Sequence, residues 1–103
     1  GLAMSSRNAY LDAGQRQRAA ELNRILKALV TALEGGAPVA KALENARASA
    51  HAAFDGVDYI EVRDAETLAA LTDGPLDRAA RVLGAVRLGS TRLIDNMAAK
   101  AGG

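Results

Sequence analysis

Apolar side chains recur every three or four residues in two stretches of the chain, a spacing that places them on one face of an α-helix. The first stretch forms one continuous stripe of Leu22, Ile25, Leu26, Leu29, Val30 and Leu33. The second repeats at the same steps through Val39, Leu43, Ala46, Ala50 and Phe54. Gly35 and Gly36 separate the stretches, and Pro38 suits a helical first turn. We predict two antiparallel helices, the first capped by Asp12 and the second over about 38–53.

Residues 57–63 follow a different pattern, with β-branched and aromatic side chains in alternation. Ile60 and Val62 fall on the face opposite Tyr59 and Glu61, because successive side chains of a strand point to opposite faces. This segment is therefore predicted to be a strand with one face buried.

Two further strands are predicted at 81–88 and 91–96, joined by Gly89 and Ser90. Glycine followed by serine fits a type II′ turn, whose first central residue needs a positive φ. The resulting hairpin places Arg87 opposite Arg92. Two like charges side by side are unfavourable unless an anion lies nearby. The candidates are Glu61, Asp64 or a ligand, and the role of the two arginines stays open. We interpret them, together with Glu61 and Asp95, as a structural ion network and not as a catalytic site.

The remaining segments complete the predicted order of elements. Asp64 is a plausible cap for a short helix over 64–71, which the turn-forming residues 72–75 would end. The small and polar stretch 97–103 is predicted to be a frayed tail. The order helix, helix, strand, helix, strand, strand predicts one α+β domain over 1–103, with a small three-stranded, mainly antiparallel sheet covered by helices.

Composition narrows the classes of function. The 103 residues fit one compact domain. With 13 basic and 12 acidic side chains, the net charge is close to zero, so the molecule as a whole should not attract nucleic acid or an acidic membrane surface from a distance. The chain has no cysteine, and its one histidine, His51, lies among alanines, so we predict no metal site. No apolar run approaches the ~20 residues of a membrane helix, and the first residues do not follow the basic-then-apolar pattern of a signal peptide, so we expect a soluble, cytoplasmic protein.

Three separated segments carry a family resemblance. They read GLAMSSRN followed by YL at 1–8 and 10–11, DYIEVRD at 58–64, and RLGSTRLIDN at 87–96. In this order they resemble the C-terminal domain of bacterial pantothenate synthetases and span nearly the whole chain. The resemblance implies the lid domain of a two-domain, nucleotidylyl-transferase-like enzyme, with residues 1–11 as a functional loop.

Within that loop, Met4-Ser5-Ser6-Arg7 resembles the mobile KMSKS loop of nucleotidylyl transferases. Ala3 stands where KMSKS has its first lysine, a form that many pantothenate synthetases share. The resemblance implies that Met4, Ser5, Ser6 and Arg7 bind ATP and that Arg7 is catalytic, stabilising the leaving pyrophosphate. A guanidinium group suits this role because it is always charged and can hold two phosphate oxygens at once.

The family resemblance also implies the reaction of an ATP-dependent ligase in coenzyme A biosynthesis. D-Pantoate and ATP, with Mg²⁺, would give pantoyl adenylate and pyrophosphate, and β-alanine would then displace AMP to form pantothenate. The HxGH motif and the pantoate pocket belong to the family's N-terminal Rossmann-like domain, through which the enzyme is usually a dimer. We therefore expect the isolated chain to be inactive.

A second reading belongs to another class of function. Part of the first helix is basic, through Arg16, Arg18, Arg24 and Lys27, which is compatible with a free-standing interaction module or a weak nucleic-acid-binding module. Glu21 and Glu34 interrupt this surface, and a solvated helix face explains it more simply.

Overall fold

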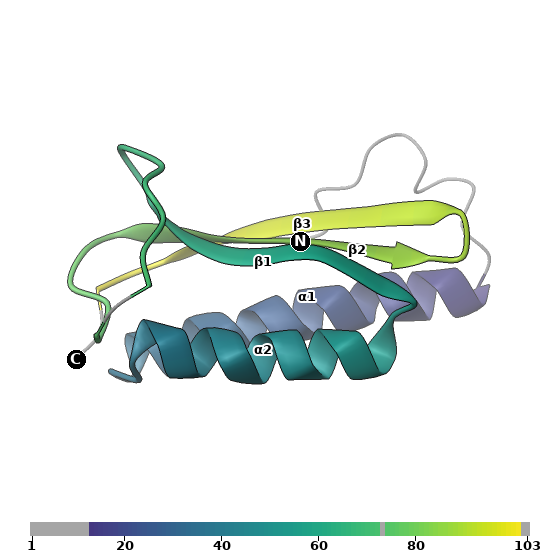
Figure 1. Cartoon of the computed structure of the whole chain (residues 1–103), viewed down its shortest axis with the longest axis horizontal. Coiled ribbons are helices and arrows are strands. Elements are labelled where there is room, and N and C mark those ends of the chain that lie inside the picture. Colours follow the sequence, from purple (N-terminus) through teal and green to yellow (C-terminus); the bar gives the residue numbers. More distant parts are fainter. Residues whose placement is uncertain (1–12, 73, 102–103) are drawn as a thin grey trace.

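The computed structural model describes residues 13–72 and 74–101, which form two helices and one three-stranded sheet. The elements are α1 (Ala13–Glu34), α2 (Val39–Ala53), β1 (Gly56–Asp64), β2 (Ala80–Leu88) and β3 (Thr91–Ala99). The sheet order is β1-β2-β3, and both pairings are antiparallel. The two helices lie side by side beneath one face of the sheet (Figure 1). The predicted α+β class, with helices covering a small antiparallel sheet, is confirmed.

The predicted apolar stripes form the side of the helices that faces the sheet. Leu22, Leu26 and Leu33 of α1 are at most 1% exposed, while Val30 is only partly buried at the edge of the core. The first helix ends at Glu34, and Gly36 with φ of 94° turns the chain toward α2. Both helices lie where the periodicity predicts them. The predicted cap Asp12 lies outside the described residues. No helix within the described ranges is both long and apolar enough to cross a membrane.

The core lies between the helix pair and the inner face of the sheet. The strands contribute Ile60, Val62, Val82, Val86 and Leu93, all at most 1% exposed. α2 contacts β1, and α1 contacts β2 and β3. Gly84 lets α1 approach closely, because a Cβ atom there would lie 3.2 Å from Leu22 Cδ1 and 3.2 Å from Leu26 Cδ2.

The β2–β3 hairpin has the predicted register, with Leu88 opposite Thr91 and Arg87 opposite Arg92. Gly89 has φ of 60°, the positive value that the predicted turn requires at its first central position. The anion beside the arginines is Asp58, which is neither of the protein candidates Glu61 and Asp64. A register shift between Val57 and Tyr59 places Asp58 in an irregular part of β1, which strict alternation does not reveal.

The predicted helix over 64–71 is wrong. The Asp64 carboxylate does accept hydrogen bonds from the backbone N–H groups of Glu66 and Thr67, at 2.7 and 3.0 Å, as a helix cap would. Leu68 then adopts a φ of 63°, which stops helical propagation after one turn. The chain returns along β1, where the Leu71 N–H donates to the Val62 carbonyl at 2.8 Å.

The predicted frayed tail at 97–103 is wrong for its first three residues. β3 continues to Ala99, where Met97, Ala98 and Ala99 pair with Val82, Arg81 and Ala80 of β2. Small side chains suffice there, because the ladder is formed by the backbone and Ala99 is buried against the core. The Lys100 N–H also donates to the Glu34 carboxylate at 3.0 Å, which ties the strand end to α1.

Candidate functional site

The site residues predicted from the sequence, Met4, Ser5, Ser6 and Arg7, lie outside the described residues. Five residues separate Arg7 from Ala13, where α1 begins. If residues 4–7 belong to a site, the described residues show only the neighbouring part of it, which is α1 and the elements that hold α1 in place.

The start of α1, the end of α2 and the hairpin turn of β2 and β3 lie at the same end of the molecule (Figure 1). Arg18 of α1 donates from Nη1 to the carbonyl oxygen of Ala53, at 3.1 Å. Asp55, in the connection from α2 to β1, accepts the Gly89 N–H at 2.6 Å. Its own N–H donates to the Arg87 carbonyl at 3.0 Å. Polar contacts thus join α1, α2 and the hairpin into one unit at this end.

This end also carries exposed positive charge. Asp58 accepts from Arg87 Nε at 2.9 Å and from Arg92 Nε at 2.7 Å, so one carboxylate serves two guanidinium groups. The Arg92 guanidinium also lies over the Tyr59 ring, 5.9 Å from its centroid. The cluster of Asp58, Arg87 and Arg92 has a net charge of one positive unit, and the two arginine side chains are 64% and 46% exposed. Such a cluster is compatible with an anionic neighbour.

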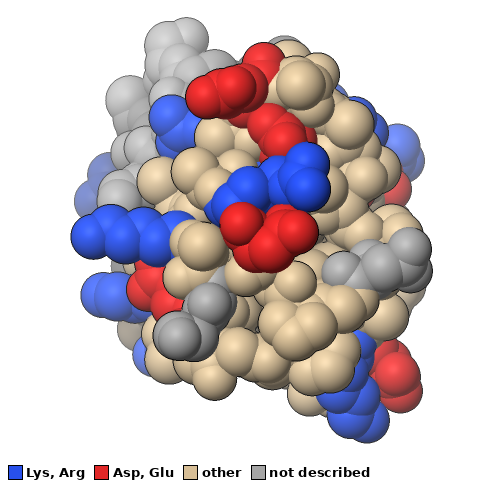
Figure 2. All heavy atoms as spheres, turned by 90° about the vertical axis from the view of Figure 1, so that its left-hand side faces the viewer, with Lys and Arg blue, Asp and Glu red and all other residues tan. Residues whose placement is uncertain are grey.

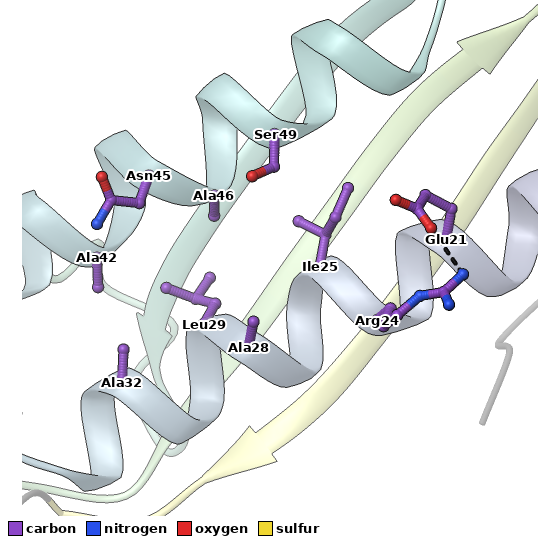
Figure 3. Close-up of a pocket in the computed structure, with 10 residues that line it drawn as sticks. All are labelled: Glu21, Arg24, Ile25, Ala28, Leu29, Ala32, Ala42, Asn45, Ala46 and Ser49. Carbon is purple, nitrogen blue, oxygen red and sulfur yellow. Dashed lines mark hydrogen bonds and ion pairs between the residues drawn. The ribbon is translucent and has the colours of Figure 1, made fainter.

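A groove of about 350 Å³ runs between α1 and α2. Figure 3 shows that the two helices lie in front of the strands, with the labelled side chains between and around them. Its floor is apolar, with Ile25 and Leu29 largely buried and small alanines on both helices. At its rim the Arg24 guanidinium is held by Glu21 at 2.7 Å. Asn45 and Ser49 of α2 add polar groups to the lining, so the groove combines an apolar floor with a few polar side chains.

The opposite end of the molecule carries charges of both signs close together, as Figure 2 shows. Arg78 contacts Asp77 at 2.8 Å and Asp64 at 3.4 Å. The pKa of Asp64 is lowered by the backbone N–H groups of Thr67 and Glu66 and, to a smaller extent, by Arg78. The same guanidinium lowers the pKa of Asp77, and these carboxylates raise the pKa of Arg78. The network stabilises the connection between β1 and β2. Within the described ranges, no group of acidic, histidine or cysteine side chains could hold a metal ion.

Sequence reasoning had grouped Asp95 with Arg87, Arg92 and Glu61, and the structure separates them. Glu61 pairs with Arg63, whereas Asp95 lies on the inner face of β3 and is 0% exposed. Asp95 Oδ2 accepts from Asn23 Nδ2 of α1 at 3.1 Å. The alternation in β3 was the available signal, because Asp95 has the same parity as the core residue Leu93.

Comparisons with known proteins find relatives that are named for one enzyme. The family model described as pantoate-beta-alanine ligase matches residues 1–98. A pantothenate synthetase of Maricaulis maris (strain MCS10) is 67% identical over 99 residues, which are 96% of this chain and 34% of that protein. The pantothenate synthetase of Caulobacter vibrioides is 49% identical over 100 residues, covering 95% of this chain and 35% of that protein.

A solved structure agrees in fold. The crystal structure of pantothenate synthetase from Thermus thermophilus superposes with a TM-score of 0.79 at 38% sequence identity. The superposition covers 94% of this chain and 35% of that chain. This chain thus spans about a third of the length of the curated relatives it matches.

Proposed function

We propose, from the premise that this chain belongs to the pantoate-beta-alanine ligase family, that it is the C-terminal lid domain of an ATP-dependent pantoate–β-alanine ligase. The observation that carries the proposal is the family match over residues 1–98, which includes the Met4–Arg7 segment together with the described fold. In the complete enzyme, the pantoate carboxylate attacks the α-phosphorus of MgATP and pyrophosphate leaves. The β-alanine amine then attacks the acyl carbon of pantoyl adenylate, and AMP leaves as the amide forms.

Arg7 is the residue to which we assign a catalytic role. Negative charge grows on the pyrophosphate as the bond to the α-phosphorus breaks, so donors placed there stabilise the transition state more than bound ATP. The guanidinium group supplies a permanent charge and paired donors, and the hydroxyls of Ser5 and Ser6 add directional hydrogen bonds. Met4 contributes to the binding of the nucleotide in this proposal. A loop at a domain edge can close over ATP, exclude water and then release products.

The other domain of the proposed enzyme supplies what this chain lacks. The relatives are about three times as long as the matched region, and we assign the pantoate pocket, the HxGH motif and the dimer contact to a Rossmann-like domain in their remaining part. We expect the reaction to take place in the cytoplasm, where ATP is produced and used. The isolated chain should form no pantothenate above background.

The test uses an assembled enzyme, in which this chain replaces the matching third of the Maricaulis maris synthetase. The assembled enzyme should make pantothenate. Its Arg7→Ala variant should form pantoyl adenylate about 100-fold more slowly, the scale seen when one transition-state donor is removed. Arg16→Ala is the matched control, because Arg16 is an exposed cation on α1, and it should retain full activity. Full activity in Arg7→Ala would remove Arg7 from the mechanism, and an inactive assembled enzyme would contradict the proposed function.

The contacts of α1 do not favour the nucleic-acid-binding alternative. Arg18 donates to the Ala53 carbonyl, and Arg24 is paired with Glu21. Arg16 and Lys27 remain exposed on the described helix. Two exposed cations are much less positive charge than a nucleic-acid-binding surface usually carries. Binding of this chain to duplex DNA that fell steeply with salt and depended on Arg16, Arg18 and Lys27 would revive the alternative.

A further inference from the structure

Asp95 is a charged side chain in a place where the fold provides mostly hydrocarbon. It is 0% exposed on the inner face of β3, the face that also carries Leu93. Gly84 is its partner in the β2–β3 ladder, and the side chains of Leu22 and Leu26 lie over that glycine. Burial of a carboxylate is unfavourable unless hydrogen bonds replace its water, and an apolar side chain of similar size is often at least as stabilising. The carboxylate therefore calls for an explanation other than stability.

The contacts of Asp95 are directional. Oδ1 accepts the N–H of Asn96 at 2.8 Å, which holds the carboxylate against its own strand. Oδ2 accepts from the side-chain amide of Asn23 at 3.1 Å, which reaches across to α1. The bond therefore joins residues 72 positions apart in the sequence and connects the helix to the last strand.

This bond restrains the middle of α1, whereas the hydrogen bond from the Lys100 N–H to Glu34 ties the end of β3 to the far end of that helix. Leu22, Leu26 and Leu29 pack through apolar atoms, and apolar attraction has no preferred direction. A hydrogen bond weakens steeply when its distance or angle changes. Asn23 follows Leu22 and precedes Leu26, the two residues whose side chains lie over Gly84, so the bond acts in a part of α1 that packs closely on the sheet.

We propose that Asp95 and Asn23 are positioning residues for the ligase reaction. Their hydrogen bond sets the position of α1 on β3 and, through α1, the place at which the Met4–Arg7 segment meets ATP. The segment precedes α1 by five residues, so a shift of the helix moves its point of attachment. This inference rests on the proposed function, since it assigns the two residues a role in the adenylation step.

The test compares Asp95→Asn with Asp64→Asn in the assembled enzyme. Asparagine keeps the size of the side chain and one acceptor, but removes the charge. Asp64 is the matched control, because it is the other largely buried aspartate among the described residues and lies at the end of β1, away from the start of α1. We expect Asp95→Asn to lower kcat for adenylate formation, measured as ATP–pyrophosphate exchange, about tenfold or more, because small misplacements of reacting groups are costly. The KM for pantoate, which binds the other domain, should be unchanged.

Asn23→Ala should lower the same kcat, whereas Asp64→Asn should leave it unchanged. The second readout is amide hydrogen exchange in the assembled enzyme. Exchange in α1 should become faster in Asp95→Asn and Asn23→Ala, with exchange in α2 unaltered. Unchanged kcat in Asp95→Asn, or an equal loss in Asp64→Asn, would overturn the positioning role. Unchanged exchange in α1 would overturn the restraint itself. An unsubstituted assembled enzyme without activity would contradict the proposed function and with it the catalytic role of the pair, while the exchange measurement still decides whether the pair restrains α1.

Discussion

Arg87 and Arg92 stand directly opposite each other in the β2–β3 ladder, and their Nε atoms bind the two oxygens of one carboxylate. That carboxylate, Asp58, separates two charges that would otherwise repel across the strands. We predict that Asp58→Asn lowers the free energy of unfolding of this chain by about 0.5–1 kcal/mol at low salt, a size limited by the exposure of both arginines. Urea denaturation at low and high salt measures the effect, which should shrink as salt screens the repulsion.

The double variant Asp58→Asn/Arg92→Gln is the control for this explanation. It lacks the carboxylate but also lacks the like-charge pair, so it should be more stable than Asp58→Asn alone. If the single and double variants unfold at the same urea concentration, repulsion between the arginines is not the cause.

Gly84 is required by the close approach of α1 to β2. A Cβ atom at this position would lie 3.2 Å from terminal carbons of Leu22 and Leu26, which are both buried and have little room to move. Gly84→Ala should therefore destabilise this chain by about 1–2 kcal/mol through overpacking. Gly56→Ala is the matched control, because a Cβ atom there meets Arg87 at an ordinary 3.7 Å, and its stability should change by less than about 0.5 kcal/mol. Equal losses in the two variants, measured by thermal unfolding, would contradict the packing argument.

Local periodicity was enough to predict most of the fold. Leu22 and Leu26 follow the helical spacing, and the parity of residues around Gly89 predicts that Arg87 and Arg92 face each other. Both patterns depend only on residues near in sequence. The partner of the arginines could not be predicted in this way, because Asp58 reaches them only through an irregularity in β1.

In the candidate site, too, sequence reasoning found some of the proposed residues and missed others. Arg7 was proposed from a motif, whereas Asp95 was overlooked because a charged residue near other charged residues was assumed to lie on the same surface. The alternation in β3 places it instead on the inner face, where Asn23 of α1 meets it. The turn after β1 was also misjudged, because a capping aspartate looks the same in sequence whether a helix or a single turn follows.

Leu68 closes that single turn in a conformation that suits few side chains. Its φ of 63° is unfavourable for a branched residue with a Cβ atom, and its side chain is 58% exposed, so little burial is lost on replacement. Leu68→Asn should raise the free energy of unfolding by about 0.5–1 kcal/mol, because asparagine tolerates the left-handed region. Leu68→Ala removes the same apolar surface without relieving the backbone and should be near neutral. Chemical denaturation of this chain and the two variants distinguishes the cases, and a gain of equal size in Leu68→Ala would rule out the backbone explanation.

Asp64 gives the chain a predictable dependence on acid. Its pKa is lowered in the folded state by the backbone N–H groups of Thr67 and Glu66 and then by Arg78, whereas the unfolded chain has the ordinary aspartate value of about 3.9. Between the two values the unfolded state binds more protons, so stability rises with pH in that window. The contribution is therefore fully present above the unfolded pKa and is lost as pH falls through the folded one. The difference in unfolding free energy between this chain and Asp64→Asn should be constant from about pH 7 to 5 and should shrink below about pH 4. A difference that stayed constant to pH 2, or grew on acidification, would contradict the assigned direction of the pKa shift.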